Sequence, residues 1–141
     1  MKHLSLLTLL CFVLILSGCN KEGTVQPTSE ELVEGNWKGT LNGITLEINF
    51  IEGEFEGYPT LTGSANFISN NEMLSYKVMG GTIVRKSKKV WFALNKIPVV
   101  EKEEYHIEGT VSGTWINGTY EKLTQSGEII ETGTWNVKKL P

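Results

Sequence analysis

The segment Ile44–Phe50 alternates strictly between apolar and polar side chains, and this alternation limits the fold more than any other feature of the sequence. Side chains along a β-strand point to opposite faces in turn, so the pattern predicts a strand with one buried and one solvated face. Asn42 and Gly43 precede it, and both residue types tolerate the positive φ angles of a two-residue hairpin turn. Residues 36–42 are therefore predicted to form its antiparallel partner.

Similar short segments, separated by turn residues, recur to the end of the chain. The paired glycines Gly80 and Gly81 lie inside one of them and predict a β-bulge or a bend. Short strands at regular spacing, with no convincing helix between them, are typical of a β-sandwich or a β-barrel. The predicted strands after the first hairpin are 58–67, 73–84, 90–97, 103–111, 115–123 and 128–137.

We expect an all-β domain built as an eight-stranded antiparallel up-and-down β-barrel. Consecutive hairpins favour pairing between strands that are neighbours in sequence, and closing the sheet removes both exposed edges. A Greek-key β-sandwich is the alternative. The basic run Arg85–Lys89 is interpreted as a solvated hairpin tip. It is the only such cluster in a chain of net charge −3, so no nucleic-acid partner is expected.

Residues 1–18 have the order of a secretory signal peptide, with a basic start, an apolar run over Leu4–Leu16 and small residues before Cys19. The apolar run is shorter than the ~20 residues that a helix needs to cross a bilayer. Residues 19–34 are polar and predict a flexible tether. Residues 35–141 remain as the β-barrel domain.

The residues Leu16-Ser17-Gly18-Cys19 resemble the lipobox of bacterial lipoproteins. The resemblance implies that the chain is cut before Cys19, that the Cys19 sulfur carries a diacylglyceryl group and that the new amino group is acylated. Several acyl chains anchor a protein stably to a membrane. The implied location is the bacterial cell envelope, and Asn20 is compatible with the outer membrane, on either its periplasmic or its outer side. An ordinary signal peptide with an incidental Cys is the alternative.

The motif Gly35-Asn36-Trp37 is similar to the Gly-x-Trp of lipocalins, and Gly113-Thr114-Trp115 and Gly118-Thr119-Tyr120 resemble strand sequences of avidins. A lipobox before a small Gly/Thr/Trp-rich β domain resembles the lipocalin-like lipoproteins of Bacteroidetes, and this resemblance to the calycins implies a barrel. One departure is clear. Lipocalins usually carry a late Arg that packs over the first-strand Trp, whereas this chain has only Arg85 and places lysines at 138 and 139.

An eight-stranded barrel is just wide enough to be filled by its side chains or to hold one small ligand. The inward residues are mostly large, so any pocket is expected to be modest, with the polar end of an apolar ligand near the open rim. Avidin biotin sites need an Asp, which this chain lacks, so no biotin site is expected. The predicted ligand-binding residues are Trp37, Leu46, Ile48, Phe50, Phe92, Leu94, Tyr105 and Ile107.

We expect no catalysis, cofactor or metal site. Cys11 would leave with the signal peptide and Cys19 would carry lipid, so no thiol remains. His106 and Glu104 are predicted to share a strand face opposite Tyr105, where a cleft would be needed to make them a general acid–base pair. The expected explanation is an exposed polar face.

Two further hypotheses stay open beside ligand binding: a protein-binding or inhibitory envelope module, and a structural protein with a filled core. Val99-Val100 and Tyr58-Pro59 are predicted loop residues that would supply an apolar contact surface. The tryptophans beside glycines are expected to plug the barrel ends and pack the core. Glu52, Glu54 and Glu56 are interpreted as a solvated acidic loop, with weak cation binding as the alternative.

Overall fold

The computed structural model describes residues 33–97 and 103–141. The predicted signal peptide, the Cys19 lipidation site, the tether up to residue 32 and Val99-Val100 lie outside the described residues. Within them, no helix is long and apolar enough to cross a membrane. The elements are β1 (Gly35–Leu41), β2 (Ile44–Phe55), β3 (Tyr58–Ser69), β4 (Glu72–Val84), the 3₁₀ turn η2 (Arg85–Ser87), β5 (Lys89–Ile97), β6 (Glu104–Ser112), β7 (Trp115–Leu123) and β8 (Ile129–Lys139).

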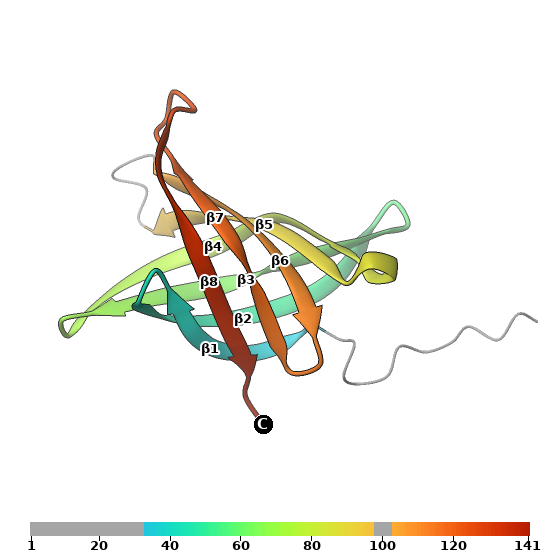
Figure 1. The fold of residues 1–141 in the computed structure, drawn as a ribbon. Helices are drawn as coiled ribbons and strands as arrows, with labels where there is room; N and C mark the ends of the chain where they lie inside the picture. The colour runs from blue at the N-terminus through green and yellow to red at the C-terminus, as the bar shows by residue number, and fades with distance from the viewer. Residues whose placement is uncertain (1–32, 98–102) are drawn as a thin grey trace, which may run out of the picture.

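The strands form one closed antiparallel barrel in which each strand pairs with its neighbours in sequence (Figure 1). Strands β1 and β8 complete the circle, with Trp37 opposite Lys139 and Leu41 opposite Trp135. The predicted eight-stranded up-and-down β-barrel is confirmed, and the alternative β-sandwich is wrong. The basic run at η2 forms the predicted hairpin tip between β4 and β5.

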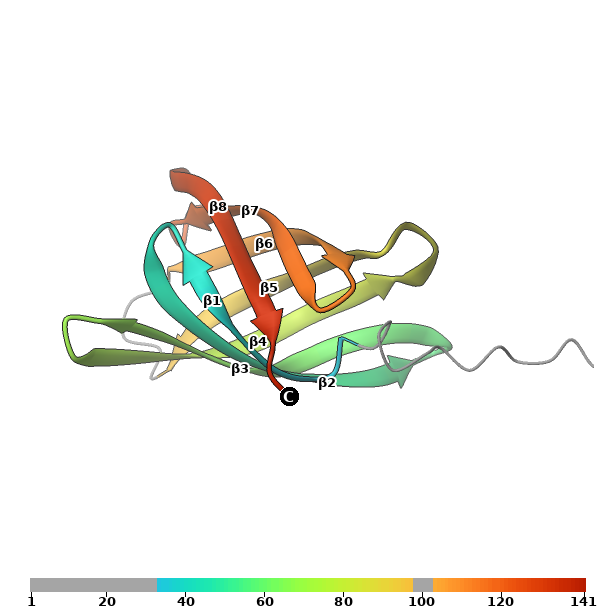
Figure 2. The same cartoon turned by 60° about the horizontal axis from the view of Figure 1, so that its bottom comes forward.

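Because consecutive strands run in opposite directions, their turns alternate between the two ends of the barrel (Figure 2). One end holds the start of β1, the β2–β3, β4–β5 and β6–β7 turns and the end of β8. The other end holds the β1–β2, β3–β4 and β7–β8 turns. We name them the closed end and the open end, after the packing described below.

The barrel interior is a continuous core of apolar side chains. In β2, Leu46, Ile48 and Phe50 are buried, while the residues between them are partly exposed, as the alternation predicted. Aromatic rings meet edge to face across the core, with ring centroids 5.1 Å apart for Phe50 and Phe92 and 5.5 Å apart for Phe92 and Trp135. This geometry is favourable for aromatic pairs.

Two local predictions made from glycine positions are confirmed. Asn42 and Gly43 form the β1–β2 turn with φ angles of 48° and 82°. The β4–β5 register shifts between Met79 and Thr82, which places the predicted bulge at Gly80 and Gly81. The bend needs a residue without a side chain, since a Cβ on Gly81 would lie 2.5 Å from the Leu61 carbonyl oxygen.

Two glycines, Gly133 and Gly109, are covered by aromatic rings from neighbouring strands. A Cβ on Gly133 would lie 2.7 Å from a ring carbon of Tyr120, and one on Gly109 would lie 2.7 Å from the Trp135 ring. Trp37 and Trp135 are buried in the core as predicted. Trp115 is 43% exposed, so its predicted role as a plug is wrong.

The predicted loops around Glu52–Glu56 and at Tyr58-Pro59 are also wrong. Strand β2 continues to Phe55, β3 begins at Tyr58, and only Glu56 and Gly57 form the turn between them. The turn is tight because both residues take positive φ angles, 52° and 81°. The resulting hairpin runs past β1, whose pairing with β2 begins at Gly35 opposite Phe50.

Barrel closure depends on a close approach between β1 and β8 at Gly39. A Cβ there would lie 2.0 Å from the Asn136 carbonyl oxygen and 2.7 Å from the Val137 Cα. We expect Gly39→Ala to lower the free energy of unfolding by at least about 2 kcal/mol, because backbone atoms cannot move aside as a side chain can. Urea unfolding followed by tryptophan fluorescence measures this loss.

Gly53→Ala is the matched control, because its added Cβ would meet only the Thr60 hydroxyl, at 3.1 Å. We expect a change of less than about 0.5 kcal/mol for this variant. Equal stability of the Gly39→Ala and wild-type proteins would show that closure does not depend on this approach.

Candidate functional site

The eight residues predicted to bind a ligand are brought together, but as the packed interior of the barrel. All of them belong to the buried core, and the most exposed, Tyr105, is only 9% exposed. Tyr105 alone among them lines the hollow at the open end described below. The prediction therefore identified the core correctly, and the residues that an external ligand can reach are mostly others.

The closed end is sealed by the segment that leads into β1. Val33 is fully buried, and its carbonyl oxygen accepts a hydrogen bond of 2.7 Å from the Trp37 indole N–H. Lys139 lies across the outside of the same ring, with its Nζ 5.6 Å from the ring centroid. A buried indole N–H needs such a partner, so Val33 and Trp37 fix each other in the barrel end.

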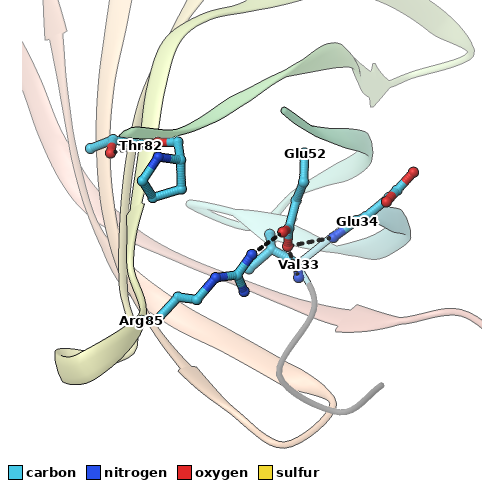
Figure 3. A network of polar contacts seen from close by, with 6 residues as sticks. Val33, Glu34, Glu52, Thr82 and Arg85 are labelled. Carbon is cyan, nitrogen blue, oxygen red and sulfur yellow. Dashed lines mark hydrogen bonds and ion pairs between the residues drawn. The ribbon is translucent and has the colours of Figure 1, made fainter. Parts of the chain in front are cut away.

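A carboxylate clamp holds this segment in place (Figure 3). The Glu52 side chain, 10% exposed, accepts hydrogen bonds from the backbone N–H groups of Val33 and Glu34. Its second oxygen accepts a hydrogen bond of 2.6 Å from the Arg85 guanidinium, which reaches over from the β4–β5 turn. Charge-assisted bonds of this kind are among the stronger polar contacts in proteins, so Glu52 joins three parts of the closed end.

The open end contains a hollow of about 260 Å³. Its apolar wall is formed by inward-facing side chains of β2, β3, β4 and β6. Ile44 and Leu74 remain 40% and 42% exposed there, although the alternation placed Ile44 inside the barrel. The lining residues are Ile44, Phe67, Ser69, Asn70, Glu72, Leu74, Tyr76 and Tyr105.

Aromatic rings form the floor of the hollow. Phe67 lies 4.7 Å from Tyr76 and 5.3 Å from Tyr105, measured between ring centroids, and both pairs are edge to face. The rings of Tyr76 and Tyr105 also meet edge to face, with 5.7 Å between their centroids. Burial, together with neighbouring ionisable groups, raises the pKa of each tyrosine to about 12.

Charged groups lie beside this floor. Lys122 places its Nζ 5.6 Å from the Tyr105 ring centroid and 2.6 Å from a Glu103 carboxylate oxygen. Glu131 accepts hydrogen bonds from the Tyr120 hydroxyl and, at 3.4 Å, from the Asn42 side-chain amide. Burial and the Glu131 carboxylate raise the pKa of Tyr120. The open end thus joins an apolar floor to hydrogen-bonding groups and charges of both signs.

His106 and Glu104 share the outer face of the barrel as predicted, with 3.2 Å between Nε2 and a carboxylate oxygen. His106 also lines a groove of about 390 Å³ on this face, beside Trp91, Glu108 and other residues of β5, β6 and β7. The pair is roughly half exposed, with exposed side-chain fractions of 54% and 42%. Among the described residues no hydroxyl is hydrogen-bonded to His106.

The acidic residues near the β2–β3 turn do not come together as a cation site. Glu52 faces the barrel end and is bound by Arg85 and two backbone N–H groups. Over residues 33–97 and 103–141, no group of three or more His, Cys or acidic side chains is placed to hold a metal ion.

Sequence reasoning missed three apolar residues of the hollow, namely Phe67, Leu74 and Tyr76. The alternation of residues 74, 76 and 78 with polar neighbours indicates that they share a face. It does not indicate that Leu74, near the start of β4, projects beyond the packed interior. That outcome depends on the lengths of the neighbouring strands.

Comparison with known proteins gives no further constraint. No family model, no curated protein and no solved structure matches this chain.

The tyrosine pKa values predict how stability depends on pH. An unfolded tyrosine ionises near pH 10.0, whereas Tyr76 and Tyr105 stay protonated to about pH 12 in the folded barrel. Their contribution to stability is complete below pH 10 and is lost as the pH rises to 12. The loss is at most about 1.4 kcal/mol per pH unit for each residue.

We expect Tyr76→Phe to make this decline in the free energy of unfolding less steep, as measured by urea unfolding between pH 9 and 12. Tyr58→Phe is the control, because Tyr58 is 73% exposed and should leave the slope unchanged. If the free energy of unfolding declined equally steeply with pH in both variants and in the wild type, the raised pKa of Tyr76 would be contradicted.

Proposed function

We propose that this chain is a lipid-anchored, non-catalytic β-barrel of the bacterial cell envelope that binds a small apolar ligand at its open end. One observation carries the ligand proposal: Ile44 and Leu74 face the hollow at the open end, yet are 40% and 42% exposed. Inward-facing apolar surface that water still reaches favours occupation by an apolar group.

The dimensions of the hollow limit the ligand. Its volume of about 260 Å³ is below the roughly 300–1,000 Å³ of typical small-molecule pockets. Since the barrel below is occupied by its own aromatic side chains, only a small group fits, such as one ring or a short alkyl branch. The remainder of the ligand would extend along the rim, where Lys122, Glu103 and the Asn70 side chain offer polar contacts.

The resemblance to lipocalins and other calycins gains support from the closed end. Lys139 lies 5.6 Å from the centroid of the Trp37 ring, at the place where lipocalins usually carry an Arg over the first-strand Trp. A lysine can make the same cation–π contact. The lipid anchor is supported by the sequence Leu16-Ser17-Gly18-Cys19.

A protein-binding module is the competing proposal, and exposed apolar residues around the open end favour it. Met73, Ile97 and Ile129 are between 50% and 63% exposed on three different strands. A partner that covered them would contact the outside of the rim, whereas a ligand in the hollow would contact Leu74 and Ile44.

Adjacent residues of β4 separate these two proposals. We expect Leu74→Glu to weaken binding of the uncharged fluorescent probe phenylnaphthylamine by about tenfold or more, because it places a charge in the apolar hollow. Fluorescence titration of the probe measures the dissociation constant. Met73→Glu is the matched control, since Met73 is 63% exposed and does not line the hollow.

Unchanged probe affinity in Leu74→Glu would remove the hollow as the ligand site. A loss of affinity in Met73→Glu alone would place the apolar contact on the outside of the rim and favour the protein-binding proposal.

The lipid anchor has a separate test in bacterial cells. We expect Cys19→Ala to accumulate uncleaved or to appear in the soluble fraction, because the residue that would carry the acyl chains is absent. Fractionation and metabolic labelling with a radioactive fatty acid measure the change. Lipidation at Cys19 would be contradicted if the variant were cleaved to the length of the mature wild-type protein and were still fully associated with the membrane.

A further inference from the structure

The exposed aromatic side chains of the described residues gather at the closed end of the barrel. Phe55, Tyr58 and Trp115 are 67%, 73% and 43% exposed and are the three aromatic members of the exposed large apolar group. Phe55 and Tyr58 face each other across the β2–β3 turn, and Trp115 follows the β6–β7 turn. Large rings of this kind are normally buried, so their presence on two tips of one end calls for an interaction partner.

Basic residues accompany these rings. The β4–β5 turn, at the same end, carries Lys86 and Lys88 beside Arg85. Lys138 places its Nζ 5.5 Å from the centroid of the Trp115 ring. Two carboxylates, Glu54 and Glu56, also lie near the β2–β3 tip. The attraction of this tip to a partner must therefore come from its rings, and the attraction of the β4–β5 tip from its lysines.

The described turns of the open end have a different composition. The β1–β2 turn is Asn42-Gly43, the β3–β4 turn is Asn70-Asn71, and the β7–β8 turn contains Gln125, Ser126 and Gly127. Neither these turns nor the strand residues that directly flank them include an aromatic or a basic residue, whereas Phe55, Tyr58 and Trp115 directly flank turns of the closed end. The two ends of the barrel are thus chemically distinct wherever the structure describes their turns.

The chain enters the barrel at the aromatic end. Val33 is buried there, and Glu52 holds the backbone N–H groups of Val33 and Glu34. Residues 20–32 separate Val33 from Cys19, a length of chain that reaches at most about 50 Å. A lipid on Cys19 would therefore keep the barrel near the bilayer and attach it through its closed end.

We propose that the closed end is a second membrane contact, in which Phe55, Tyr58 and Trp115 enter the headgroup layer and Lys86 and Lys88 bind anionic headgroups. Tyrosine and tryptophan favour this layer because one part of each side chain is apolar and the other polar. Lysines near the surface are attracted to anionic lipids. The proposal rests on the proposed lipid anchor for the identity of the partner, and it directs the open end away from the bilayer.

The test uses a chain of residues 20–141, which contains every described residue and cannot be lipidated at Cys19. Binding is measured by co-sedimentation with vesicles of phosphatidylcholine alone or mixed with phosphatidylglycerol. We expect the wild-type chain to bind the mixed vesicles. The triple variant F55S/Y58S/W115S should bind each kind of vesicle at least about tenfold more weakly than the wild-type chain does. We expect K86S/K88S to weaken binding to the mixed vesicles only.

The matched control removes three exposed apolar residues from the open end, as M73S/I129S/I130S, and should bind like the wild-type chain. Unfolding midpoints of all variants confirm that they are folded. The proposal is overturned if the wild-type chain does not sediment with vesicles, or if the open-end variant loses as much binding as the aromatic variant. Neither outcome bears on lipidation, which the Cys19→Ala experiment tests in cells.

Discussion

The backbone pairing of β1 with β8 is the contact on which the rest of the barrel depends. It separates an inside from an outside, so that alternate residues of all eight strands face one shared core. The pairing covers only Trp37–Leu41 on β1, and it is close enough that Gly39 has no room for a side chain. Without it, the indoles of Trp37 and Trp135 would lose the enclosure in which their N–H groups bond to the Val33 and Glu108 carbonyl oxygens.

Closure also determines where a function can lie, because buried apolar side chains of the described strands pack together inside the barrel. The rings of Phe50, Phe92 and Trp135 meet across the core at van der Waals distances, and such interiors leave little space for a ligand. The surfaces open to chemistry are therefore the outer face and the two ends. The ends differ because Val33 and Glu52 seal one of them, whereas Ile44 and Leu74 stay partly exposed at the other.

The strands and their order were predictable because the signals that specify them are local. Asn42-Gly43 needs only its own backbone angles, and the alternation in β2 repeats every two residues. Glu52 shows where this reasoning fails. The rule that charged residues face water predicts a loop there, yet Glu52 is 10% exposed at the end of the barrel. Its carboxylate is satisfied by Arg85, far along the chain, and by the N–H groups that precede β1. No local sequence pattern indicates that Glu52 pairs with these distant groups. Nor does any local pattern indicate that Leu74 projects beyond the core.

Ligand binding at the open end and membrane contact at the closed end are compatible, because the two surfaces lie at opposite ends of the barrel. If Cys19 carries the proposed lipid, contact of the closed end with the bilayer would become an intramolecular event, with an effective concentration of roughly millimolar. A surface of three aromatic rings and a few lysines, which binds a membrane only weakly when the protein is free, would then be occupied most of the time. Such occupancy would orient the barrel, and the open end, with Tyr76 and Tyr105 at the floor of its hollow, would face the solution from which a ligand arrives.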